Sequence, residues 1–273
     1  MLLRISLIVF FIMTIISLLL LAALLPNLTF SAHVNVGIVN GKEAKPHSRP
    51  YMVSLQHNGQ HFCGGFLISD EFVLTAGHCF IDRAVTVVVG AHDLRRTNAK
   101  VGVKSYYRHP FYSDKPYIRN DIMLLRLEKK VKKSKKVNWI SISKKTDDKW
   151  ISILENTTDT EAGIACSVAG WGLLKTKGKV STRLMEARVK VLSDRTCESK
   201  WRQHYVASMM ICQIGHGGTC QGDSGGPLVC GKTAVGITSF GSAERCNNPK
   251  LPNVSTKISS YIPWIRLIVG KTE

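Results

Sequence analysis

The sequence predicts an all-β protein, and two observations support this prediction. Apolar residues make up 44% of the chain, and they fall into short β-branched runs without a long helical period. The chain also contains 22 glycines, which are frequent where short strands are joined by turns. A length of 273 residues is enough for one or two domains with a sizeable core.

The first 25 residues differ from the rest of the chain. Arg4 precedes an almost unbroken apolar run, Ile5–Leu25, which is typical of a membrane-targeting signal. Small residues at Thr29 and Ser31 offer a signal-peptidase site, so we expect a signal peptide over residues 1–31 and a secreted protein. Because the run is long enough to span a bilayer, a signal anchor is the alternative.

Ser224 lies in the stretch best suited to nucleophilic chemistry. A serine hydroxyl attacks a carbonyl only when a base takes its proton and hydrogen-bond donors face the oxyanion that forms. In Gly222-Asp223-Ser224-Gly225-Gly226, the glycines permit a tight turn in which the amides of Gly222 and Ser224 point at one spot, an oxyanion hole. The same residue types also make ordinary surface turns, so this motif alone is ambiguous.

Two other motifs supply a base and an orienting carboxylate. Leu74-Thr-Ala-Gly-His78-Cys79 places a histidine just after an apolar strand, and Asp121 opens the apolar run that ends at Leu127. Taken singly, His78 could be a strand-end histidine bonded to backbone, and Asp121 an ordinary turn carboxylate. The chain order His78, Asp121, Ser224 is nevertheless one of those known for a catalytic triad of base, orienter and nucleophile.

Together the three motifs resemble those of chymotrypsin-type serine peptidases, and within them the granzyme and mast-cell protease branch. The resemblance covers residues 38–268. It implies two six-stranded antiparallel β-barrels, packed face to face with the catalytic cleft between them, and a C-terminal helix. The activity it implies is that of a serine endopeptidase, which hydrolyses peptide bonds through an acyl-enzyme on Ser224, with His78 as general base and Asp121 as orienter.

The resemblance also divides the chain. We expect a peptidase domain over 38–273, with an N-terminal barrel over about 38–140, a C-terminal barrel over about 150–260 and a helix over about 260–270. Local patterns agree with this order. The expected strands of the first barrel include 50–56, followed by the hairpin turn Asn58-Gly59, then 61–68, 72–78 and 120–127.

Later segments have signals of their own. The basic block Lys129–Lys136 has almost no apolar periodicity and is expected to be a solvated connection between the barrels. Gly170-Trp171-Gly172 marks the second barrel, and 261–269 is predicted to be an amphipathic helix with Pro263 in its first turn.

Ile38-Val-Asn-Gly41 resembles the start of the mature enzymes in this family. The resemblance implies activation by cleavage after Gly37, which would make residues 32–37 a propeptide. The freed α-amino group of Ile38 would be the cation that a buried Asp223 requires, and their ion pair would organise the oxyanion amides. Because residue 37 is neither Lys nor Arg, activation by the protein itself or by a trypsin-like enzyme is not expected.

The chain has 8 cysteines, all after the leader, which fits an oxidising compartment. Spacing alone cannot choose among their pairings, and a zinc site is the alternative, although the sequence contains no Cys-x-x-Cys pair. The resemblance implies four disulfides: Cys63–Cys79, Cys166–Cys230, Cys197–Cys212 and Cys220–Cys246.

The family pattern also locates a substrate pocket, whose residues here would be Gly218, Thr219, Ser239, Phe240, Gly241 and Asn253. No acidic residue stands at the expected pocket floor, so a preference for Lys or Arg before the scissile bond is not expected. A buried amide at Asn253 favours a partner that can form hydrogen bonds, or narrows the pocket. We expect a neutral residue before the scissile bond, with large apolar side chains as the first choice and polar uncharged ones as the second.

The net charge of +18 predicts binding to polyanions, and nucleic acid is not expected because no recognition motif is present. The resemblance implies storage on a heparin-like sulfated proteoglycan in a cytoplasmic secretory granule, protein or peptide substrates, serpin-type inhibitors, and no membrane contact after signal removal. No cofactor or metal is expected. Asn156-Thr-Thr is a glycosylation sequon in a polar loop, whereas the sequon at Asn253 is expected to be buried and unused.

Two other functions are the alternatives to an active secreted endopeptidase. One is a cationic binding protein of the same fold without catalysis, although such relatives usually lose the serine or histidine that this chain retains. The other is a protease anchored at the membrane by the leader.

Overall fold

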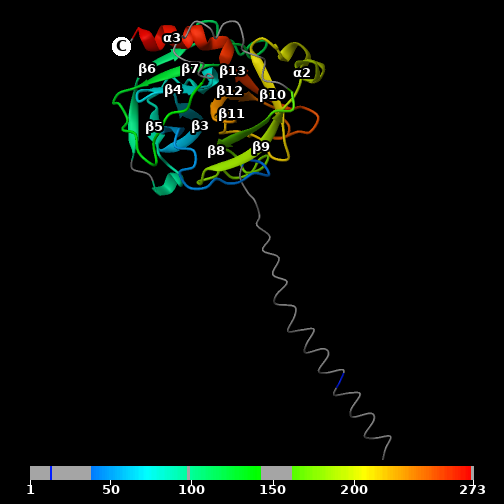
Figure 1. The fold of residues 1–273 in the computed structure, drawn as a ribbon, viewed down its shortest axis with the longest axis horizontal. Helices are drawn as coiled ribbons and strands as arrows, with labels where there is room; N and C mark the ends of the chain where they lie inside the picture. Colours follow the sequence, from blue (N-terminus) through cyan, green and yellow to red (C-terminus); the bar gives the residue numbers. More distant parts are fainter. Residues whose placement is uncertain (1–12, 14–37, 97–98, 143–161, 272–273) are drawn as a thin grey trace, which may run out of the picture. The chain divides into compact units, whose positions relative to one another are not determined.

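The computed structural model describes Met13 and residues 38–96, 99–142 and 162–271 (Figure 1). The expected signal peptide and propeptide, and the sequon at Asn156, lie outside the described residues.

Six antiparallel strands close into a first barrel (Figure 1). Their order around the barrel is β2-β3-β4-β7-β6-β5, and β5 completes the ring by pairing with β2. The strands are β2 (Met52–His57), β3 (Gln60–Leu67), β4 (Phe72–Thr75), β5 (Thr86–Val89), β6 (Lys100–Arg108) and β7 (Met123–Leu127).

The second barrel closes in the order β8-β9-β10-β13-β12-β11, with β11 pairing back to β8. Its strands are β8 (Ala165–Gly170), β9 (Met185–Val191), β10 (Met210–Ile214), β11 (Pro227–Cys230), β12 (Thr233–Phe240) and β13 (Asn253–Lys257). The short strand β1 (Lys42–Glu43) adds to the edge of β9.

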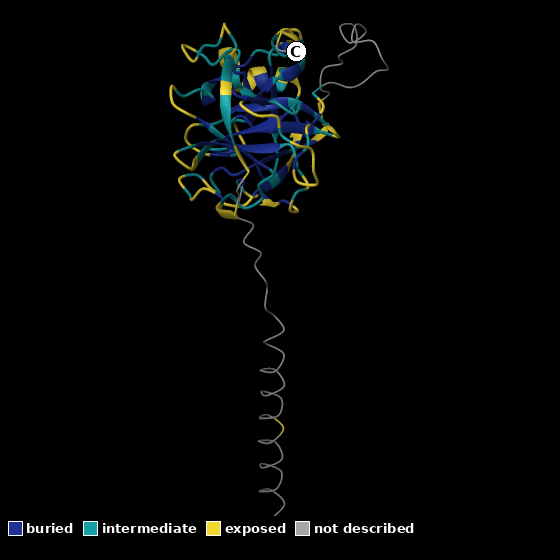
Figure 2. Ribbon diagram, turned by 90° about the vertical axis from the view of Figure 1, so that its left-hand side faces the viewer, coloured by how far each residue is buried: buried dark blue, intermediate teal, exposed yellow. Residues whose placement is uncertain are grey.

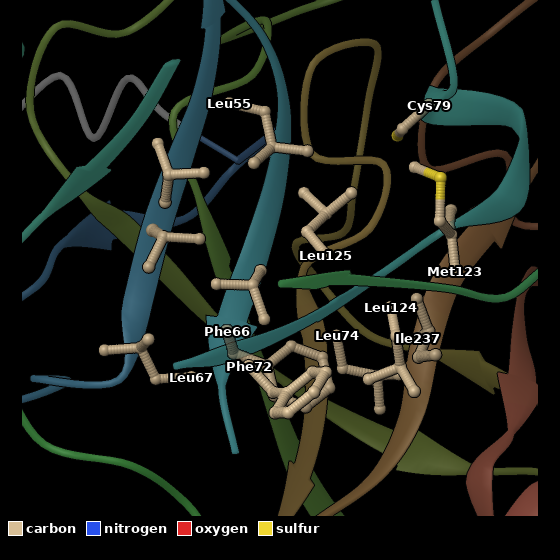
Figure 3. Close-up of a cluster of buried hydrophobic side chains, with 14 of the residues drawn as sticks. Leu55, Phe66, Leu67, Phe72, Leu74, Cys79, Met123, Leu124, Leu125 and Ile237 are labelled. Carbon is tan, nitrogen blue, oxygen red and sulfur yellow. The ribbon is translucent and has the colours of Figure 1, made fainter. Parts of the chain in front are cut away.

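Large apolar side chains fill the first barrel, where the strands bury residues that the sequence supplies as β-branched, leucine and phenylalanine runs (Figure 3). Phe66, Phe72, Leu74, Leu124 and Leu125 are each at most 1% exposed. Complete burial of such a side chain contributes roughly 1.5–3 kcal/mol to stability. The exposed residues lie mainly in the loops around the strands (Figure 2). The barrels are therefore rigid supports for the loops they carry.

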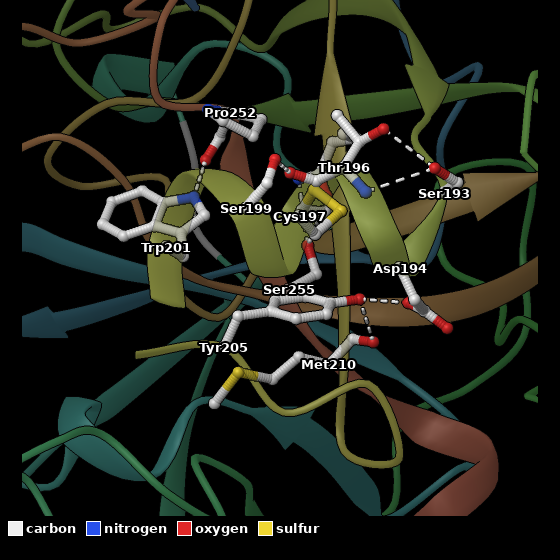
Figure 4. The surroundings of a disulfide bond; sticks show 12 residues. Ser193, Asp194, Thr196, Cys197, Ser199, Trp201, Tyr205, Met210, Pro252 and Ser255 are labelled. Atoms are coloured by element: carbon white, nitrogen blue, oxygen red, sulfur yellow. Dashed lines mark hydrogen bonds between the residues drawn. A yellow bond between two sulfur atoms is a disulfide. The ribbon is translucent and has the colours of Figure 1, made fainter. Parts of the chain in front are cut away.

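Helices α2 and α3 of the described residues lie outside the barrels. The terminal helix α3 (Ile262–Gly270) has a proline in its first turn, and its buried Ile265 joins the apolar cluster of the first barrel. Helix α2 (Asp194–Trp201) is capped by Ser193, whose hydroxyl accepts a hydrogen bond from the Thr196 amide (Figure 4). Helix α3, at the C-terminal end of the chain, thus packs against the N-terminal barrel.

The predicted fold class, two six-stranded antiparallel barrels with a C-terminal helix, is confirmed. Helix α2 was not among the predicted elements. The structure contains disulfides that join the cysteines paired by the resemblance, namely Cys63–Cys79, Cys166–Cys230, Cys197–Cys212 and Cys220–Cys246.

Candidate active site

His78 lies directly after β4, in a short 3-10 turn over Gly77–Cys79. The disulfide from Cys79 to Cys63 anchors this turn to β3. A Cβ atom at Gly77 would lie 2.8 Å from the Tyr112 ring and 3.3 Å from Asp121 Oδ1. Glycine at position 77 therefore permits the close approach of Asp121 to the histidine.

Asp121 lies just before β7 and is only 2% exposed. Its Oδ1 accepts a hydrogen bond of 2.8 Å from the His78 amide, and its Oδ2 lies 2.8 Å from His78 Nδ1. The Ser239 hydroxyl donates a further hydrogen bond to Oδ2. An ionised carboxylate is acceptor-only, so Nδ1 carries the proton and Nε2 is left as the basic nitrogen.

Burial and charge act against each other in this pair. Burial lowers the pKa of His78, but the hydrogen bond and the negative charge of Asp121 outweigh burial, and the pKa lies above its ordinary value. Burial raises the pKa of Asp121, but the hydrogen bond and charge of His78 and the hydroxyl of Ser239 outweigh it, and the pKa lies below its ordinary value. Asp121 therefore remains a carboxylate that stabilises a protonated His78.

The turn that carries Ser224 comes from the second barrel and packs against the first. The Gly64 amide of β3 donates a 2.8 Å hydrogen bond to the Ser224 carbonyl. A Cβ at Gly225, whose φ is +80°, would lie 3.1 Å from the Ala76 amide nitrogen and would overlap Thr75 Oγ1. Only glycine fits at position 225, and this contact places Ser224 beside the segment that leads to His78.

The reactive atoms of this site are not engaged with one another. Neither Ser224 Oγ nor His78 Nε2 forms a hydrogen bond with any residue that the structure describes. The amides of Gly222 and Ser224 likewise have no acceptor within the described part of the chain. Catalytic hydrogen bonds are often long without substrate and tighten when it binds. These four groups are therefore free to contact a substrate.

His61 contacts the turn that carries Ser224. Its Nε2 lies 2.9 Å from the Gly222 carbonyl oxygen, and its Nδ1 lies 2.8 Å from Ser54 Oγ. Burial lowers the pKa of His61 to about 4, so the ring is neutral near pH 7. The Nε2–H group then donates a hydrogen bond to the Gly222 carbonyl oxygen. Gly222 has a φ of +93°, a backbone conformation that favours glycine.

Asp223 belongs to the same turn and is completely buried. Its carboxylate accepts hydrogen bonds from the amides of Gly172 at 2.8 Å and Cys220 at 3.0 Å. No Lys, Arg or His in the described ranges forms an ion pair with it. Burial, only partly offset by these amides, raises the pKa of Asp223 to about 7. The buried side chain of Ile38 belongs to the core of the same barrel.

A pocket of about 180 Å³ opens beside Ser224. Five of the six pocket residues expected from the sequence line it: Thr219, Ser239, Phe240, Gly241 and Asn253. Gly218 is not among the lining residues, because the amides of Asn253 and Asn247 cover it: a Cβ at position 218 would lie 2.9 Å from Asn253 Nδ2 and 2.5 Å from Asn247 Oδ1.

Asn253 is the main constriction of this pocket. Its Nδ2 faces the Thr219 carbonyl at 3.5 Å, and its Oδ1 would lie 2.5 Å from a Cβ at Gly241. The amide therefore reaches from β13 toward the opposite wall. No described residue donates a hydrogen bond to Asn253 Oδ1.

The structure adds contacts that sequence reasoning did not find. Ser239, predicted only as a substrate-binding residue, also bonds to Asp121, and Thr256 donates a 2.8 Å hydrogen bond to the Asp121 carbonyl. The only sequence signal for these two contacts was position, because Ser239 lies on β12 and Thr256 on the neighbouring strand β13. The nearest cluster of metal-ligand residue types that the described segments contain is Cys63, His78 and Cys79, and its two cysteines form a disulfide rather than thiolate ligands.

The family model described as Trypsin matches residues 38–265. The chain belongs to the trypsin family. This trypsin-family chain is 37% identical to granzyme M of Homo sapiens over 93% of its own length and 97% of that protein. It is 41% identical to granzyme B of Homo sapiens over 84% of its length and 90% of that protein.

Other relatives agree with this assignment. Serine protease 57 of Homo sapiens is 37% identical over 86% of this chain and 82% of that protein. Among solved structures, neuropsin, a serine protease expressed in the limbic system of mouse brain, matches with a TM-score of 0.75 and 32% identity, over 85% of this chain and 99% of that one. This trypsin-family chain is a granzyme-like serine endopeptidase. Within its described residues, no helix has the length and apolar character needed to cross a membrane.

Proposed function

We propose that the chain cleaves proteins through an acyl-enzyme on Ser224, with His78 as general base and Asp121 as orienter. The observation that carries this proposal is the bond between Asp121 and His78 Nδ1, which leaves Nε2 basic beside a turn whose amides are free. His78 Nε2 takes the Ser224 proton as Oγ attacks the substrate carbonyl. The oxyanion that forms accepts hydrogen bonds from the amides of Gly222 and Ser224.

The remaining steps use the same groups. Protonated His78, stabilised by Asp121, donates its proton to the leaving amine, and the peptide bond breaks to give the acyl-enzyme. Water then attacks the acyl carbon while His78 Nε2 takes its proton. The bond from this carbon to Ser224 Oγ breaks as protonated His78 returns the proton to Oγ, which releases the acid and restores the Ser224 hydroxyl. Every step therefore requires the same basic nitrogen.

Activation is part of this proposal. Cleavage after Gly37 frees an ammonium group at Ile38, and this group pairs with Asp223, the buried carboxylate for which the described residues offer no cation. The pairing fixes the turn that holds the oxyanion amides. The bridge between Val39 and Gly218 supports this assignment, because it already joins the segment after Ile38 to the second barrel.

The pocket supports a neutral residue before the scissile bond. The described residues that line the pocket include no charged side chain, and Asn253 limits the pocket, whose volume is about 180 Å³. Because Asn253 Oδ1 has no donor within the described residues, a substrate side chain of intermediate length with an N–H or O–H group satisfies it. The geometry thus favours polar uncharged side chains over the large apolar ones expected first.

Storage and inhibition complete the proposed function. The net charge of +18 supports retention on a sulfated polyanion such as a heparin-like proteoglycan, in a secretory granule or after secretion. The exposed lysines of the basic block Lys129–Lys136 are the first candidates for this contact. Serpin-type inhibitors, which present a cleavable peptide segment, fit the same active-site pocket.

The test is hydrolysis of a peptide library by the protein that begins at Ile38. We expect cleavage after neutral residues by the wild type and none by Ser224→Ala. Ser199→Ala, an exposed serine on α2, is the matched control and should cleave as the wild type does. Turnover by Ser224→Ala near the wild-type rate would remove Ser224 from the mechanism, and a wild type without turnover would favour a non-catalytic cationic protein.

A further inference from the structure

A second pocket, of about 700 Å³, shares no lining residue with the pocket beside Ser224. Its walls come from four separate stretches of the chain: residues 43, 46 and 47; residues 89–93, 96 and 99, from the end of β5 onward; residues 134, 136 and 137; and Arg183 before β9. We call it the basic pocket. None of these residues takes part in the proposed catalytic steps.

The acidic residues of the basic pocket are already paired. Asp93 accepts hydrogen bonds of 2.9 and 2.6 Å from Arg95, and Glu43 contacts His92 at 2.8 Å and Arg183 at 3.0 Å. These contacts neutralise both carboxylates. They leave the pocket with an excess of positive charge.

Two cations of the basic pocket remain uncompensated. Arg96 and Lys136 are exposed, and neither forms an ion pair with a residue in the described segments. Burial, and then the positive charges of Lys136 and His92, hold the pKa of His47 below its ordinary value. The ring nitrogen His92 Nδ1 is buried and lacks a hydrogen-bond partner in the described part of the chain. The local potential therefore favours a negatively charged ligand.

Much of the remaining lining is apolar. Val89, Ala91, Val137 and Pro46 contribute to it between the charged side chains. A densely sulfated glycan could reach the cations but would leave these apolar groups without a partner. An acidic peptide matches both features, because its carboxylates can reach the cations while an apolar side chain covers the hydrophobic part.

We propose that the basic pocket is an exosite that binds an acidic segment of protein substrates, with substrate carboxylates at Arg96 and Lys136. This inference rests on the proposed endopeptidase function and adds a second point of substrate selection. Contacts made at an exosite are present in both the bound substrate and the transition state, so they lower KM without raising kcat. A short peptide that occupies only the pocket beside Ser224 gains nothing from them.

The direct test measures binding without catalysis. Fluorescence anisotropy of a labelled peptide of Glu, Asp and Leu residues is followed with Ser224→Ala protein that begins at Ile38. We expect Arg96→Glu/Lys136→Glu to weaken binding about tenfold at low salt, and added salt to weaken binding to the parent protein. Arg96→Gln/Lys136→Gln should weaken it less, and its thermal unfolding shows whether loss of binding reflects loss of fold.

The matched control is Lys190→Glu/Lys232→Glu, which makes the same change in net charge at exposed lysines outside the basic pocket. Equal weakening by both double variants would show a general charge effect and overturn the proposal. The proposal would also be overturned if the acidic peptide did not bind, while a heparin-derived oligosaccharide bound in a way that depends on Arg96 and Lys136.

Kinetics provide the second test. For a protein substrate with an acidic tract, Arg96→Glu/Lys136→Glu should raise KM about tenfold with kcat unchanged, while a short neutral peptide is cleaved as by the wild type. Equal KM values for the protein substrate would overturn the exosite. If the wild type cleaves nothing, the endopeptidase proposal fails, and the binding test with Ser224→Ala still decides the exosite.

Discussion

Asp223 should make the stability of the uncleaved protein depend on pH in a way that cleavage after Gly37 removes. Its pKa is raised to about 7 in the folded protein from an ordinary value of 3.8, because the carboxylate is fully buried without a cation among the described residues. A raised folded pKa stabilises the fold fully below pH 3.8, and this contribution is lost as pH rises through 7. At about 1.4 kcal/mol per pKa unit, the loss approaches roughly 4 kcal/mol.

In the proposed activation, cleavage changes this balance because the new ammonium group at Ile38 would pair with the ionised carboxylate. The assay compares thermal unfolding of Ser224→Ala protein that begins at Ile38 with the same protein that retains residues 32–37. We expect the gap in Tm to widen by roughly 5–10 °C between pH 5 and pH 7.5, since 1 kcal/mol shifts Tm by about 2–4 °C at this size. Above about pH 8, loss of the ammonium proton should narrow it again.

The control is Asp223→Asn, which removes the titrating group and keeps its size. In that variant the two forms should unfold at temperatures whose difference does not change with pH. A gap that stays constant with pH in the parent protein, or one that widens equally in Asp223→Asn, would refute the reasoning.

Three further predictions follow from the site. Asp121→Asn should lower kcat about 10²- to 10⁴-fold, because the amide cannot hold the Nδ1–H tautomer of His78, as measured with a chromogenic peptide; unchanged kcat would contradict it. In the wild type, kcat/KM should rise with pH, and the midpoint of this rise should lie above about 6.5, because His78 must be neutral and its pKa is raised. A midpoint well below that value would contradict the role of His78 as the base. Gly225→Ala should abolish activity and destabilise the protein by about 1–3 kcal/mol in denaturant unfolding, because a Cβ overlaps Thr75 Oγ1 at a positive φ; a fully active variant would show that the turn can move.

Composition and short apolar runs predicted an all-β protein, and the resemblance of three motifs to one family implied the two barrels and the triad. A nucleophilic serine needs a base, an orienting carboxylate and donors for the oxyanion, and the three motifs resemble those of one family in residue type and in chain order. His78, Asp121 and Ser224 could therefore be proposed before their contacts were known. The structure brings His78 and Asp121 into hydrogen-bond contact and packs the Ser224 turn against the segment before His78.

Other features depend on contacts between distant segments and could not be predicted. Helix α2 is short and polar, and it is held by the Cys197–Cys212 disulfide and by the hydrogen bond from Trp201 to the Pro252 carbonyl (Figure 4). The depth of the pocket beside Ser224 depends on the direction of the Asn253 side chain, which is set by its packing against Gly218 and Gly241. The basic pocket combines four segments that no local pattern connects.

Covalent labelling tests the central claim most directly. A serine-directed phosphonate with a neutral side chain is incubated with the protein that begins at Ile38, and the modified residue is located by mass spectrometry. We expect one label per chain, on Ser224, and none in His78→Ala, because the hydroxyl then lacks its base. Absence of label from the wild type, or a label at another residue, would contradict the account.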